Sequence, residues 1–127
     1  MRHDTTISST RTHIAAAALL DRWAAHDWSD GLRITELLPL DRVVVRTMNS
    51  TYEIVVTAAG ASDIMVRGGA FFASLTRARL AGSSLGGSFL KLHVIHVGFR
   101  MEIVTDQHPI ITSPVQTIAV TRATVVM

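Results

Sequence analysis

The beginning of the chain carries a helical pattern of apolar and polar positions. Residues 1–10 are polar and rich in serine and threonine, which predicts a flexible tail. Over residues 11–28 the apolar residues recur at the helical spacing, so they share one face of an α-helix. The sequence Ser29-Asp30-Gly31 is a stop signal. We therefore expect a tail over residues 1–10 and one N-terminal helix over residues 11–28.

From residue 32 onward apolar residues alternate with polar ones, which is the period of a β-strand, and turn-forming residues separate the alternating segments. Strand spacing of this kind predicts a mainly β fold, a small antiparallel barrel or sandwich of about eight short strands with one N-terminal α-helix. We expect a single domain over residues 11–127, β-rich over residues 32–126. The expected strands include Leu32–Leu38, Val43–Thr47, Tyr52–Thr57, Asp63–Arg67, Ile110–Thr112 and Val115–Thr121, whereas Phe71–Arg79 fits a strand, a loop or a helical turn.

A phase shift divides the segment Phe89–Thr105. Its first apolar residues stand at even positions and its later ones at odd positions, and one unbroken strand cannot bury both sets. We expect a turn or bulge over Ile95–Gly98, with Gly98 supplying an unusual backbone conformation. The even set is Leu90, Leu92 and Val94, and the odd set is Val97, Phe99, Met101 and Ile103.

Composition adds a hypothesis about association. Hydrophobic residues make up 48% of the 127 residues and charged residues 17%, so a small core leaves apolar side chains for a partner to cover. The chain has no cysteine, which excludes disulfides and thiol chemistry. No segment approaches the ~20 apolar residues of a membrane-spanning helix, and the start lacks a secretory pattern. We therefore expect a cytoplasmic homo-oligomer, or a protein bound to a protein partner, with no cofactor and no membrane contact.

Three short motifs occur together in the β-rich part: Thr47-Met48-Asn49-Ser50-Thr51-Tyr52, the glycine-serine run that begins at Gly82, and Thr112-Ser113-Pro114-Val115. In this order they resemble a group of small uncharacterised bacterial β-rich proteins with T-x-N-S-x-Y and T-S-P-V motifs. The resemblance implies a small β-domain and implies no catalytic residue. Asn49 and Ser50 suit a hairpin turn, and Pro114 suits the end of an edge strand because it has no N–H to donate.

The predicted helix offers a candidate interaction surface. Its apolar residues include two tryptophans five positions apart, which cannot both occupy the centre of one narrow stripe. Packing of the first on the β-domain is the ordinary explanation, and docking of the helix on a partner or a second copy is the alternative, because aromatic anchors contribute most to interfaces. The candidate interaction residues are Leu19, Leu20, Trp23 and Trp28.

The glycine-serine run offers a candidate ligand site. Gly82-Ser83-Ser84-Leu85-Gly86 matches the G-x-S-x-G pattern of a nucleophile elbow, but that motif needs a following helix and strand-like residues follow here. A loop between strands is the simpler interpretation, and binding of an anion by its amides and hydroxyls is the functional alternative. The residues of this possible anion loop are Ser83, Ser84, Gly86, Gly87 and Ser88.

Basic residues offer a second possible function. The net charge of +2 is small, and the arginines form no run. A fold that gathered them on one face, with Tyr52 or Phe99 stacking a base, would bind single-stranded nucleic acid. The residues of that possible face are Arg67, Arg77, Arg79, Lys91 and Arg100. His93 and His96 are three residues apart, so on a strand they point to opposite faces and predict no metal site.

Overall fold

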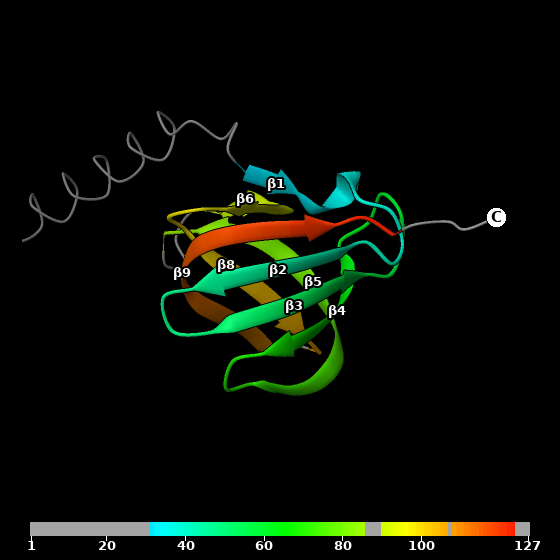
Figure 1. The fold of residues 1–127 in the computed structure, drawn as a ribbon. Coiled ribbons are helices and arrows are strands. Elements are labelled where there is room, and N and C mark those ends of the chain that lie inside the picture. The colour runs from blue at the N-terminus through cyan, green and yellow to red at the C-terminus, as the bar shows by residue number, and fades with distance from the viewer. Residues whose placement is uncertain (1–30, 86–89, 107, 124–127) are drawn as a thin grey trace, which may run out of the picture.

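The computed structural model describes residues 31–85, 90–106 and 108–123, and these residues are mainly extended (Figure 1). One short 3-10 helix, η2, and nine strands lie within them. The elements are β1 (Gly31–Arg33), η2 (Ile34–Glu36), β2 (Arg42–Thr47), β3 (Thr51–Val56), β4 (Asp63–Gly68), β5 (Phe72–Ser84), β6 (Leu90–Leu92), β7 (Val94–His96), β8 (Arg100–Thr105) and β9 (His108–Thr121).

The larger sheet has the strand order β4-β3-β2-β9-β8-β5-β6, and an additional pairing between β4 and β5 joins the order into a ring. All pairings are antiparallel, which confirms the predicted mainly β, antiparallel fold. The ring is not a closed barrel. The long strands β5 and β9 change partners along their length, and among the described residues this leaves half-edges without a neighbouring strand. Of the two predicted architectures, barrel or sandwich, the barrel is therefore wrong.

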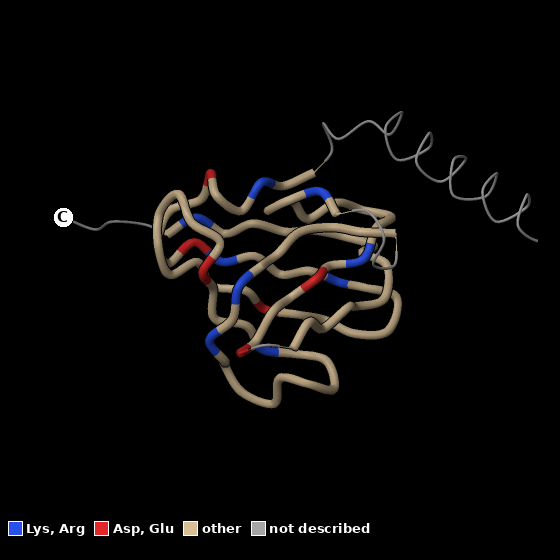
Figure 2. The backbone as a smooth tube through the Cα atoms, turned by 180° about the vertical axis from the view of Figure 1, so that it is seen from behind, with Lys and Arg blue, Asp and Glu red and all other residues tan. Residues whose placement is uncertain are grey.

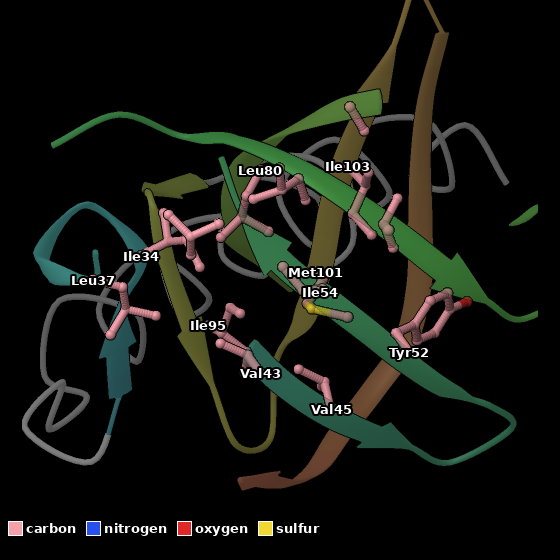
Figure 3. Close-up of a cluster of buried hydrophobic side chains, with 14 of the residues drawn as sticks. Ile34, Leu37, Val43, Val45, Tyr52, Ile54, Leu80, Ile95, Met101 and Ile103 are labelled. Carbon is pink, nitrogen blue, oxygen red and sulfur yellow. The ribbon is translucent and has the colours of Figure 1, made fainter. Parts of the chain in front are cut away.

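Strict alternation places one side of each short strand in the core. The burial of β2 and β3 alternates residue by residue, so Val43, Val45, Ile54 and Val56 are fully buried while their neighbours face outward. The two strands predicted over Val43–Thr47 and Tyr52–Thr57 are confirmed. Figure 3 shows Leu37 and Tyr52 at opposite sides of the core cluster, with Met101 between them.

A small second sheet covers one side of this core. It pairs β1 with β7, and Ile34 and Leu37 of the adjoining segment are buried with Ile95 of β7 in the same cluster. The predicted strand Leu32–Leu38 is wrong over most of its length, because η2 interrupts it directly after β1. Ile34 and Leu37 are three residues apart, so on a strand they would point to opposite faces. The turn of η2 brings both side chains into the core.

The predicted phase shift is resolved by two turns instead of one. Gly98, with φ of 92°, turns the chain between β7 and β8 as expected. A second turn lies at His93, which has φ of 60° and separates β6 from β7. Leu90 and Leu92 consequently face outward, 38% and 57% exposed, so the prediction that they share a buried side is wrong.

Two predicted boundaries also differ. The ambiguous segment Phe71–Arg79 belongs to β5, a strand of 13 residues with a register irregularity at Gly82. Thr112-Ser113-Pro114 does not end an edge strand, because it lies inside β9, which has 14 residues. Pro114 is tolerated there because the ladder is irregular on both sides of it. The predicted tail 1–10 and the predicted helix 11–28 lie outside the described residues.

Candidate interaction surfaces

The motif residues around Thr47 and Ser113 meet in space and hold two strands together. Thr47 is buried, and its hydroxyl accepts hydrogen bonds from the Ser113 hydroxyl at 2.8 Å and from the Ser50 amide at 3.1 Å. The Ser113 hydroxyl in turn accepts a hydrogen bond of 3.0 Å from the Asn49 amide. These contacts fix the β2–β3 turn against β9. The hydroxyls that carry the resemblance are therefore engaged in structural hydrogen bonds.

The serines of the predicted anion loop occupy a strand. Ser83 and Ser84 are the last residues of β5 and are fully buried. The Ser83 hydroxyl donates a hydrogen bond of 2.5 Å to the carbonyl oxygen of Val94, which holds β7 against β5. A buried hydroxyl in such a contact is not positioned to meet a ligand. Gly86, Gly87 and Ser88 lie outside the described residues.

The five basic residues of the predicted nucleic-acid face do not gather. Arg77 and Arg79 lie on β5, whereas Arg100 lies on β8, where its guanidinium donates a hydrogen bond of 3.3 Å to the carbonyl oxygen of Thr112. Lys91 lies on β6. Arg67 forms an ion pair of 2.9 Å with Glu53. Figure 2 shows basic and acidic positions interspersed along the backbone.

The residues of the predicted interaction helix, Leu19, Leu20, Trp23 and Trp28, lie outside the described residues. Of the two histidines considered for metal binding, His96 is buried and forms a contact of 2.7 Å between its Nδ1 and the Val97 carbonyl oxygen. His93 occupies the turn that precedes β7. Residues 31–85, 90–106 and 108–123 contain no group of three His, Asp or Glu side chains arranged to hold a metal ion.

An apolar hollow opens where β5 separates from the β8–β9 hairpin. It measures ≈ 510 Å³ and is lined on one side by Phe71, Phe72 and Thr76. The other side is formed by the residues Thr105, Asp106, His108, Pro109, Ile110 and Ile111. Phe71 is 67% exposed and Ile111 is 43% exposed, so large apolar surface faces solvent here.

Two smaller hollows are also lined in part by residues of β5. The first measures ≈ 250 Å³, shares Asp106 with the apolar hollow, and is lined by Asp63, Arg77 and Arg79. The second measures ≈ 340 Å³ and shares Asp63 and Arg77 with the first. We call these three hollows, each lined in part by β5, the β5 groove. This groove was not predicted from the sequence, although Arg77 and Arg79 were candidate residues of the nucleic-acid face.

The outer edge of β6 is a second candidate surface. β6 is the last strand in the order of the larger sheet, and it pairs with β5 through Gly82, Ser83 and Ser84. Its two leucines, Leu90 and Leu92, project to the same side because strand side chains alternate. An edge strand with exposed leucines offers both a strand edge and apolar area to another chain.

The most perturbed carboxyl of the described residues lies away from both surfaces. Asp41 is buried, and its two oxygens accept hydrogen bonds from the backbone amides of Ala123 at 2.8 Å and Leu38 at 2.9 Å. The Ala123 amide lowers the pKa of Asp41 most, followed by the Leu38 amide, and the nearby Arg122 adds to the lowering against the opposing effect of burial. Asp41 thus fastens the end of β9 to the turn before β2.

Within the described part of the chain no helix is both long and apolar enough to cross a membrane. No protein-family model, no curated protein and no solved structure matches the chain. A function must therefore be argued from the two surfaces themselves.

Proposed function

We propose that the protein is a non-catalytic β-domain that acts through protein contacts and associates with its own copy through the edge of β6. The observation that carries this proposal is the pair Leu90 and Leu92, exposed on a strand that has a partner strand on one edge only among the described residues. Lys91 between them is half-buried, so leucines dominate the outward side of the strand. The described part of β6 carries one charged side chain, Lys91, which projects to the side opposite the leucines.

A second copy is the occupant that this edge fits best. Two identical edge strands can pair antiparallel around a two-fold axis, because each then offers the donors and acceptors that the other needs. The leucines of both copies would lie close together across such a pair and bury each other's apolar surface. The surplus of apolar residues in the whole chain supports the same interpretation.

The test is sedimentation velocity over a range of protein concentrations with the full chain. We expect dimers that dissociate on dilution, and we expect the Leu92→Lys variant to remain monomeric because a charge would be placed in the apolar contact. Leu38→Lys is a matched control, since Leu38 has a similar exposure of 59% and lies outside β6. A wild-type chain that stays monomeric at all concentrations, or a Leu92→Lys variant that still dimerises, would contradict the proposal.

A further inference from the structure

Strand β5 has an unused half-edge beside the β5 groove. Over its first half it pairs with β4, from Gly68↔Phe72 to Asp63↔Arg79, with a register irregularity over residues 73–75. On the opposite edge β8 joins only from Arg79 onward. Among the described residues, the segment 73–78 therefore has a neighbouring strand on one side alone. Its other edge borders the groove, because Thr76, Arg77 and Ala78 line the hollows.

The charged side chains of the groove are not paired with one another. Asp63 stands directly opposite Arg79 in the β4–β5 ladder, and both line the same hollow as Arg77 and Asp106. Within the described residues, none of these four groups takes part in an ion pair of 4.0 Å or less. All four are exposed. Two cations and two anions are thus available to an incoming ligand that carries both signs of charge.

The apolar end of the groove provides a place for an anchor. Phe71 and Ile111 present exposed side chains on opposite walls, above Phe72, which is buried in the core. A hollow of this kind accepts a single large aliphatic or aromatic side chain, and burial of such a side chain contributes most of the affinity in many interfaces. The anchor site lies at the start of the unused half-edge.

From these three features we propose that the β5 groove binds an extended peptide segment of a partner protein. The segment adds a strand along residues 73–78, inserts an apolar side chain between Phe71 and Ile111, and places charged side chains of both signs near Arg77, Arg79, Asp63 and Asp106. Backbone hydrogen bonds supply affinity in strand addition, and the flanking side-chain sites supply specificity.

A peptide fits the groove better than a nucleic acid does. The phosphates of a nucleic acid are attracted by Arg77 and Arg79 but are repelled by Asp63 and Asp106, which line the same hollow. A nucleic acid also has no row of amide donors and acceptors to match a strand edge. The binding site is separate from β6, so this inference does not depend on self-association of the protein.

The first experiment selects ligands from a displayed library of random peptides of about nine residues, with the full chain as target. We expect enrichment of sequences with one large apolar residue followed by residues of both charges. The enriched peptide, labelled and titrated by fluorescence anisotropy, should bind at least about tenfold more weakly to Phe71→Ser and to Arg79→Glu. Met48→Ser is the matched control, because Met48 is 64% exposed and lies outside the groove.

Exchanging the charges of Arg79 and of the peptide residue that faces it tests this contact more directly. If an acidic residue of the peptide faces Arg79, its replacement by lysine should restore binding to the Arg79→Glu variant while weakening binding to the original protein. Leu92→Lys should bind the peptide unchanged, which separates this inference from the proposed self-association. The inference is overturned if no peptide is enriched, if the groove variants bind as well as the original, or if a single-stranded RNA of about twelve nucleotides displaces the peptide.

A second measurement examines strand addition itself. Methylation of alternate backbone nitrogens of the peptide should abolish binding at those positions whose N–H faces β5 and leave binding intact at the positions in between. Amide exchange of the segment 73–78 should slow when the peptide is added. Equal effects of methylation at both sets of positions, with unchanged exchange, would show that the peptide binds without adding a strand and would contradict the inference.

Discussion

The hydroxyl of Ser113 donates a hydrogen bond of 2.8 Å to the hydroxyl of Thr47, which lies 66 residues earlier in the chain. The contact joins the turn after β2 to the middle of β9, at the point where the ladder between these strands is irregular. It also connects two of the sequence motifs that we singled out for their resemblance to other small β-proteins. Their spacing is explained by a structural hydrogen-bond network that requires no ligand.

Removal of this contact should destabilise the fold. Thr47 is buried, so Thr47→Val leaves its former partners without an acceptor, and we expect a loss of about 1–3 kcal/mol in the free energy of unfolding. Ser113→Ala should cost a similar amount, and the double variant should cost less than the sum of the two because both remove the same interaction. Urea denaturation followed by circular dichroism measures all three.

Thr117→Val is the control for these variants, because Thr117 is exposed on the same strand. We expect a change within about 0.5 kcal/mol for this control. Fully additive effects of Thr47→Val and Ser113→Ala would contradict the role assigned to their contact.

Alternation of side chains was a reliable guide only where a strand has one buried side throughout. In β3 the buried side follows from Tyr52, Ile54 and Val56. For Leu90 and Leu92 the same alternation selects the wrong side, since the period of a strand does not state which of its faces meets the core.

Structural features that depend on pairing between strands far apart in the sequence leave no local pattern in the sequence. The turn at His93 uses a positive φ without glycine, so composition gives no signal for it. The β5 groove exists because β5 changes from β4 to β8 as its partner near Arg79, which is a property of sheet register.

Gly69 tests how closely the hairpin between β4 and β5 packs on the buried tyrosine. A Cβ at Gly69 would lie 2.6 Å from the Tyr52 hydroxyl, and the residue has φ of +61°. Gly60 has nearly the same conformation, φ of +71°, but a Cβ there meets nothing within 4 Å. Gly60→Ala should therefore cost only the backbone strain of about 1–2 kcal/mol, and Gly69→Ala about 1–3 kcal/mol more. Equal melting temperatures of the two variants would show that Tyr52 yields without cost.

The stability of a Ser83 variant tests whether the Ser83 hydroxyl has a structural role or a reactive one. Its hydrogen bond to the Val94 carbonyl oxygen is buried, so Ser83→Ala should lower the free energy of unfolding by about 1–3 kcal/mol. Ser74→Ala, at an exposed position of the same strand, should change it by less than about 0.5 kcal/mol. A Ser83→Ala variant as stable as the original protein would contradict the structural role and reopen the possibility that this hydroxyl meets a ligand.

Asp41 predicts how stability depends on pH. Its pKa is lower in the folded protein than in an unfolded chain, chiefly because the Ala123 and Leu38 amides donate hydrogen bonds to the carboxylate. The stabilisation is therefore present in full above the unfolded pKa and is lost as the pH falls through the lower folded pKa. We expect the urea concentration at the unfolding midpoint of the original protein to decrease when the pH drops below about 4. Other carboxyl groups add their own effects in this pH range.

The variant Asp41→Asn isolates this contribution. An amide side chain presents one acceptor oxygen, so either the Leu38 or the Ala123 amide loses its partner, and the variant should be less stable than the original at neutral pH. The difference between the two proteins should shrink as the pH falls below about 4, because the original loses its advantage on protonation. Asp63→Asn, at an exposed carboxyl, is the control and should leave the neutral-pH midpoint nearly unchanged. A difference between original and Asp41→Asn that stays constant from pH 7 to about pH 2 would mean that ionisation of Asp41 does not stabilise the fold.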